Sequence, residues 1–385
     1  MTDDAGSHND HDQPFSGIPF LGDIAAMLGN DASLWEGARQ TATQLATGGK
    51  PEHNVDPAVQ HRLSEISRVA ELHTAHVTHL DIVPTRTEPV TRSGWAAAAL
   101  DAIRPLMDRL SERLANETTE TTQDPFSGLL RMMSPMTVAM TAGMMVGHLA
   151  TKAFGNSDLG VPMGRVLIVP ANITDFAAEW SLDDDDVMLW VAIREHALHS
   201  VLAVPHVRAE LDGLLLRYVE GFHRSDRVFE EMLDLEVSPE ALSDPSHLTN
   251  QLQHIFGNPE LLLGVSRDDS QNDIVQRLET LLSILHAHID DVVAQAGSRL
   301  IGSFGALSEA VRRRQLTQGA DFADRLLGVR LSPEARDRGE AFIVGVIERA
   351  GRDGLARLFE PGSLPTPNEV AAPGLWLARL DLPLD

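Results

Sequence analysis

Glu195, His196 and His199, near the middle of the chain, have side chains that bind metal ions or transfer protons. They lie within SLDDDDVMLWVAIREHALHSVLAVPHVR, residues 181–208. Residues four apart share one face of a helix, so Glu195 and His199 point the same way and His196 lies one residue further round. The spacing fits a metal ligand set, an ordinary hydrogen-bonded cluster, or the remnant of a former site.

A second group of the same chemistry lies on the predicted helix 274–294. His286 and Asp290 are four residues apart and share a face, and His288 lies between them. If this helix crosses the central one, His286 is the natural third partner for Glu195 and His199. Asp290 and His288 are then candidates to support or pair with the ligands.

Two weaker groups fit solvated helix faces better than ligand sets. His73, His76 and His79 follow one another at spacings of three, which drift round a helix axis and do not converge on one ion. Glu220 and His223 form an E-x-x-H on a predicted helix over residues 209–232. Alone, that pair indicates no site.

The elements that must position these residues are mostly helices. Residues 183–186 are four consecutive acids, which are favourable at the positive N-terminal end of a helix, and Pro205 ends the central helix. Apolar residues recur with the helical period over residues 32–46, 57–77, 93–114, 135–149, 209–232 and 274–294. Residues 166–169 form the clearest strand signal, 82–91 are extended, and the tail 364–385 should pack back as extended chain. The predicted fold class is mainly α, with a few short strands.

Composition excludes several classes of protein. With 56 acidic and 31 basic residues the formal net charge is −25, which argues against binding nucleic acid or anionic membranes. The chain has no cysteine, so histidine and carboxylate side chains would have to hold any metal. The apolar stretch 135–149 is shorter than the ~20 residues that cross a bilayer. The acidic start shows no signal peptide, and we expect a cytoplasmic protein.

One large domain is the expected organisation. Residues 1–14 should be a disordered acidic tail, because they combine high charge with almost no apolar content. Residues 15–385 should form a single helical domain, with an N-terminal part over about 15–130 and a core part over about 131–385.

The order of several short sequences resembles the actinobacterial zincin-like metallopeptidases, zinc-dependent proteases of which one branch is associated with deazaflavin-coenzyme biosynthesis. The similar pieces are FSGIPFLGDI, TRSGW, VGHLA, LWVAIREHALHSVLAVPHVR, GNPELLLG, LLSILHAHIDDVV and LPTPNEV followed by PGLWLARL, which together span nearly the whole chain. The resemblance implies a zincin-like helical domain, a zinc cofactor, and a peptide or protein substrate.

The chain departs from the zincin pattern where the chemistry should lie. In H-E-x-x-H, two histidines a turn apart hold zinc and the glutamate polarises the metal-bound water. Aligned without gaps on Trp190 and Pro205, the pattern places its glutamate on Glu195, but its two ligands on Arg194 and Leu198. Neither side chain binds zinc. The resemblance also implies a Glu-Gly on the later helix, where this chain has His286 and Ala287.

Three functions follow from these residues. A rewired zinc hydrolase or metallopeptidase would use His196, His199 and His286 as ligands and Glu195 as general base. A catalytically inactive member would keep the fold as an interaction or scaffold protein, with Arg194 pairing with Glu195 in place of the metal. A metal-free enzyme would use Glu195 and a histidine for acid–base chemistry.

Overall fold

The protein, seen here in a computed structural model, is described over residues 31–78, 80, 85–117, 125–224, 263, 265–267, 271–317, 326–329 and 331–382. In chain order the elements are α2 (Asp31–Thr47), α3 (Pro57–Thr78), β1 (Thr87–Pro89), α4 (Arg92–Glu117), α5 (Pro125–Ala150), η1 (Asn156–Asp158), β2 (Val166–Ile168), α6 (Pro170–Trp180), α7 (Asp184–Leu202), α8 (Pro205–Glu220), β3 (Phe222–Arg224), β4 (Val265–Arg267), α12 (Asn272–Leu300), α13 (Phe304–Thr317), α15 (Pro333–Ala356), η4 (Arg357–Phe359), α16 (Pro367–Ala371) and α17 (Pro373–Asp381). The mainly α fold class predicted from the sequence is confirmed.

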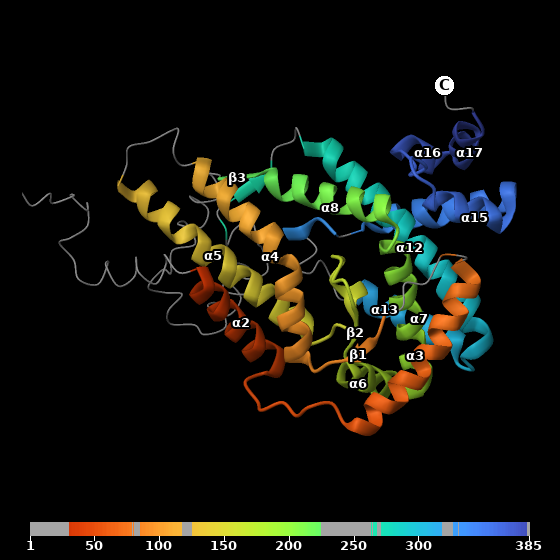
Figure 1. Cartoon of the computed structure of the whole chain (residues 1–385), viewed down its shortest axis with the longest axis horizontal. Helices are drawn as coiled ribbons and strands as arrows, with labels where there is room; N and C mark the ends of the chain where they lie inside the picture. Colours follow the sequence, from red (N-terminus) through yellow and green to blue (C-terminus); the bar gives the residue numbers. More distant parts are fainter. Residues whose placement is uncertain are drawn as a thin grey trace, which may run out of the picture.

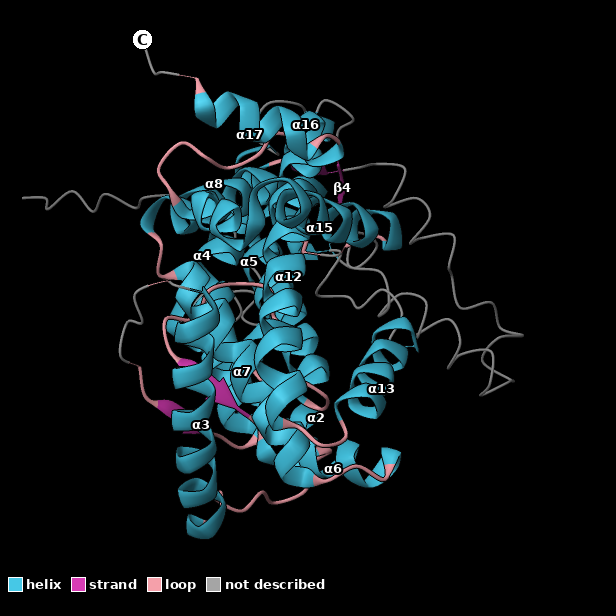
Figure 2. Ribbon diagram, turned by 90° about the vertical axis from the view of Figure 1, so that its right-hand side faces the viewer, coloured by secondary structure: helices cyan, strands magenta, loops and turns pink. Residues whose placement is uncertain are grey.

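The helices form three packed groups. Helices α2, α4 and α5 lie together in one group, α7 packs between α3 and α12 in the second, and α15 to α17 pack on the N-terminal half of α12 (Figure 1). Viewed from the side, α3, α7 and α12 run alongside one another, with α15, α16 and α17 at one end (Figure 2). Helix α7 is therefore enclosed by neighbours, and 12 of its 19 residues are buried.

Two short strand pairs complete the fold. β1 and β2 pair in parallel, with Thr87 opposite Val166 and Pro89 opposite Ile168. This pairing joins the strand and the extended segment that the sequence predicted. β2 is buried, and its last residue also forms an antiparallel bridge to Gly155. The bridge fixes the loop between α5 and β2 beside α7. β3 and β4 form a separate antiparallel pair.

The central helix ends just before Pro205, as predicted, and a second helix begins at that proline. α7 ends at Leu202, and Pro205 is the first residue of α8, which is bent by 91° from α7. Proline fits this place because the first turn of a helix has no intrahelical use for its missing N–H. The prediction that one helix holds both Glu220 and His223 is wrong, because α8 ends at Glu220 and His223 lies in β3.

The C-terminal tail was also predicted incorrectly. It packs back on the body, but as helices α16 and α17, each with a proline in its first turn. Trp376 anchors α17 against Phe342 of α15, with ring centroids 5.3 Å apart, and its indole N–H donates to the carbonyl of Ser363 at 2.6 Å. Helix α6, which begins at Pro170 directly after the predicted strand 166–169, was not predicted from the sequence.

The predicted tail over residues 1–14 lies outside the described residues. Within the described part of the chain no single helix is both long and apolar enough to cross a membrane. Only α7 and α8 taken together as a bent pair reach that length and composition.

Helices α2 and α5 approach so closely that their contact requires glycine. A Cβ on Gly143 would lie 2.5 Å from the carbonyl oxygen of Ala38, and one on Gly147 would lie 2.8 Å from that of Ala42. The four-residue spacing of these glycines predicted a smooth helix face, and α2 is the helix that packs on it. By contrast, Gly37 of α2 has open space where its Cβ would be.

We therefore expect opposite effects from two glycine-to-alanine substitutions. Gly143→Ala must push backbone away from backbone and should lower the free energy of unfolding by about 1–3 kcal/mol. Gly37→Ala meets no atom and gains helix propensity, so it should raise stability by roughly 0.5–1 kcal/mol. Urea denaturation measures both, and equal effects of the two variants would contradict the close helix contact.

Candidate functional site

The acids at the start of α7 serve the structure. Asp183 caps the helix, since its carboxylate accepts from the backbone N–H groups of Asp185 at 2.9 Å and Asp186 at 3.2 Å. Asp185 forms an ion pair with Arg62 of α3, and Asp186 accepts from the hydroxyl of Ser303 at 2.6 Å. These contacts fix the start of α7 against its two neighbours and so set the position of residues 194–199.

Glu195 is completely buried and faces the loop between α5 and β2. Its carboxylate accepts from the backbone N–H groups of Asn156 at 3.0 Å and Ser157 at 3.0 Å. A Cβ on Gly155 would lie 2.6 Å from Glu195 Oε1, so only glycine lets the loop come this close. Burial, reinforced by Asp158, raises the pKa of Glu195 to about 7, while the bonds to Ser157 and the charge of Arg194 oppose the shift.

His196 faces helix α3 and strand β1. Its Nε2 is 2.8 Å from the hydroxyl of Ser67 and 3.2 Å from that of Thr87, and the two hydroxyls are 2.6 Å apart. Burial, with His199 nearby, lowers the pKa of His196 to about 4. The ring is thus a neutral member of a hydrogen-bonded set that ties α7 to α3 and β1.

Arg194 occupies the position where the zincin pattern has its first ligand. Its guanidinium bonds the carboxylate of Asp290 and lies 3.4 Å from His286 Nδ1, and both of these partners belong to α12. The same group packs over the ring of Trp190 at 5.5 Å. Burial disfavours the charge, but Asp290 outweighs it and raises the pKa of Arg194. The cation thereby links the two central helices.

The contact with Arg194 also determines which ring nitrogen of His286 carries the proton. A guanidinium can only donate, so Nδ1 of His286 accepts and the proton of the neutral ring lies on Nε2. Burial, followed by the positive charge of Arg194, lowers the pKa of His286 to about 4. Neither nitrogen is then left with a lone pair for a metal.

Two other predicted residues have unpartnered ring nitrogens. His199 is half-buried with its Nε2 buried and without a hydrogen bond, and burial lowers its pKa. His288 is buried against Phe359, ring centroids 5.0 Å apart, and neither of its nitrogens has a partner. Burial lowers the pKa of His288 to about 4. The His288 ring packs between α12 and the C-terminal segment that contains Phe359.

The arrangement does not fit a zinc ion. His196 bonds two hydroxyl groups, His286 bonds Arg194, and the buried Nε2 of His199 has no hydrogen bond, so the three predicted ligands do not share a partner. Across the part of the chain that the structure describes, no group of three or more His, Asp or Glu side chains converges as a metal site would. The carboxylate oxygens of Glu195 accept hydrogen bonds from backbone N–H groups, whereas a catalytic base would have to contact a water molecule.

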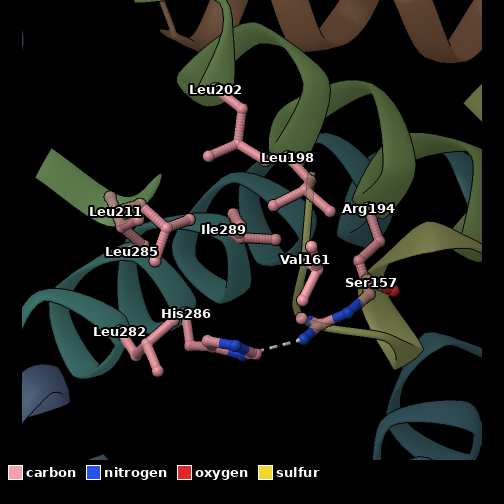
Figure 3. Close-up of a pocket in the computed structure, with 11 residues that line it drawn as sticks. Ser157, Val161, Arg194, Leu198, Leu202, Leu211, Leu282, Leu285, His286 and Ile289 are labelled. Atoms are coloured by element: carbon pink, nitrogen blue, oxygen red, sulfur yellow. Dashed lines mark hydrogen bonds between the residues drawn. The ribbon is translucent and has the colours of Figure 1, made fainter. Parts of the chain in front are cut away.

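A small hollow lies beside Arg194 and His286 (Figure 3). It is lined mostly by leucine, isoleucine and valine side chains from α7, α8, α12 and the loop before β2, and Ser157 lies at one end. Its space holds little more than one water molecule, far less than a peptide segment requires.

The partners of these residues could not be predicted from the sequence. Ser67, Thr87, Asn156 and Ser157 all contact the central helix from segments that are distant in sequence. One signal was available: a glutamate within an apolar helix needs hydrogen-bond donors, and a short glycine-containing loop is a usual source of free N–H groups. Which loop supplies them depends on the tertiary fold.

The buried histidines predict the pH dependence of stability. A histidine whose pKa is about 4 in the folded state and 6.5 when unfolded contributes stability that is present above pH 6.5 and is lost as pH falls towards 4. His288→Leu loses no hydrogen bond and should raise the free energy of unfolding at pH 5 by about 2 kcal/mol relative to pH 8. The exposed His148→Leu is the control. Identical slopes of stability against pH in wild type and His288→Leu would contradict the buried, neutral ring.

Comparison with known proteins places this site in context. The sequence model of zincin-like metallopeptidases matches residues 34–377. A crystal structure from Chloroflexus aurantiacus, described as "a putative hydrolase with a novel fold", has the same fold with a TM-score of 0.58, 20% identity, and coverage of 91% of this chain and 99% of that one. Comparison with curated proteins returned no match. Because the family match extends over most of its length, the chain belongs to the zincin-like metallopeptidase family.

Proposed function

We propose that this protein is a catalytically inactive, metal-free member of its family that acts by binding a protein partner. The observation that supports this most strongly is Arg194, a buried cation at the first ligand position of the family motif, held by Asp290 and His286. A fixed positive charge repels a metal cation from the same place. The guanidinium also occupies Asp290 and His286 of α12 as its hydrogen-bond partners.

The environment of Glu195 supports the same proposal. In a metallopeptidase the glutamate removes a proton from the metal-bound water, which requires a carboxylate oxygen open to that water. Here both oxygens accept from the backbone N–H groups of Asn156 and Ser157. The carboxylate is buried, and the neighbouring hollow is too small for a substrate. Glu195 therefore anchors the loop before β2 to the central helix.

The zinc hydrolase is the competing hypothesis. It requires His196 to leave Ser67 and Thr87, Arg194 to release His286, and both of these histidines to converge with His199. Each step gives up hydrogen bonds of buried groups, which cost about 1–3 kcal/mol apiece when left unpaired. Acid–base chemistry by Glu195 without a metal is disfavoured as well, because its carboxylate is buried and bonded to backbone N–H groups. The cytoplasmic location, the actinobacterial source and the deazaflavin association stay predictions.

Zinc content distinguishes the two hypotheses. We expect untagged protein, dialysed against excess zinc and then against buffer, to contain well below one zinc per chain by elemental analysis. The double variant Arg194→His/Leu198→His restores H-E-x-x-H around Glu195 and removes the buried cation, so it should retain more zinc than wild type.

His199→Ala serves as the matched control. If wild type holds about one zinc per chain and this variant loses it, the rewired zinc site is correct and the proposed inactive state is wrong. Circular dichroism of each variant checks that the helices remain folded.

A further inference from the structure

A second pocket lies along one face of α6, away from the hollow beside Arg194, and shares no lining residue with it. Its walls are α6, the turn that follows α5, and Arg314 of α13. We propose that it binds an arginine side chain of a partner protein. The proposal rests on the proposed function in one respect, that this chain acts by binding a protein.

The size and lining of the pocket fit a side chain. Its cavity volume is about 260 Å³, enough for one long side chain and just below the range of about 300–1,000 Å³ typical of small-molecule sites. Asp175, Phe176, Glu179 and Trp180 lie at spacings of three and four, so two carboxylates and two aromatic rings line the same face of α6.

Most charged groups of the pocket already have partners within the chain. Arg314 donates to the carbonyl of Lys152, and its guanidinium lies over the ring of Phe154 at 3.5 Å. Asp175 is paired with Arg92. Lys152 also has an interaction of its own. These contacts hold the side chains of Arg314 and Asp175 in place.

Glu179 and Trp180 are the groups that remain. Glu179 is exposed and has no hydrogen bond or ion pair with any residue that the structure describes, and Trp180 is half-buried with its ring 6.1 Å from that of Phe176. Both lie in the last turn of α6, whose negative end favours a cation. Ser181 follows in a left-handed conformation, with φ of 53°, and closes the helix by its N–H bond to Ala178. The turn that carries the two side chains is therefore defined before any ligand binds.

A carboxylate beside an indole ring selects a guanidinium group. Arginine is planar, so it stacks on an aromatic face while its N–H groups bond a carboxylate, whereas the lysine ammonium is a compact, strongly hydrated charge. Arg314 already makes such a stack on Phe154, and both residues line the same pocket. The net charge of −25 attracts a basic partner at long range.

A titration with short peptides tests the proposal on the full chain. Ac-Gly-Arg-Gly-NH2 is added to ¹⁵N-labelled protein, and the indole N–H signal of Trp180, assigned by its loss in Trp180→Phe, is followed by NMR. Ac-Gly-Lys-Gly-NH2 and Ac-Gly-Gln-Gly-NH2 are the matched ligands. We expect a saturable shift with the arginine peptide, weaker binding of the lysine peptide, and no saturation with glutamine.

Two carboxylate variants locate the binding. Glu179→Gln should weaken the arginine peptide about threefold to fivefold, the upper range for an exposed ion pair. Glu348→Gln, an exposed acid on α15, should leave the affinity unchanged. No saturable shift of Trp180, equal affinities for the arginine and lysine peptides, or equal effects of the two variants would overturn the proposal. The titration is repeated with added zinc, so that its result is independent of whether the chain proves to bind metal.

Discussion

The structure depends on one constraint: α7 is enclosed on nearly every side, so the buried polar groups of residues 194–196 must find partners inside the protein. An unpaired buried charge costs several kcal/mol, more than the net stability that most single interactions contribute. Three consecutive residues meet this constraint in three directions. Arg194 reaches α12, Glu195 reaches the loop before β2, and His196 reaches α3 and β1. The polar residues of the helix thus hold the surrounding elements in place.

If the chain binds no metal, as we propose, this distribution explains how the family fold persists. In a zincin, the metal joins side chains from different helices and satisfies their charges. Here the cation of Arg194 joins α7 to α12 through Asp290 and His286, and the peptide N–H groups of η1 satisfy Glu195. The guanidinium therefore supplies the positive charge and the link between helices that a metal would otherwise supply. It has no open coordination position at which a water molecule could be activated.

The sequence predicted the fold better than the site. Helical periodicity located α3, α4, α7 and α12, because a buried helix repeats its apolar residues whatever its neighbours are. The break before Pro205 was predicted, but the helical tail and the start of α8 at Pro205 were missed, because proline occurs both after the end of a helix and in its first turn. For the site, sequence identified the residues of α7 that carry polar groups. It could not reveal that His196 and His286 face different neighbours, since that depends on how α3 and α12 pack against α7.

The most direct test of the central claim is the position of zinc in a crystal of the protein. Crystals grown with excess zinc, measured on both sides of the zinc absorption edge, show in an anomalous difference map where each ion lies. We predict no ion within coordination distance of Glu195, His199 or His286, with Arg194 bonded to Asp290. An anomalous peak coordinated by His196, His199 or His286, with the guanidinium of Arg194 displaced, would contradict the account.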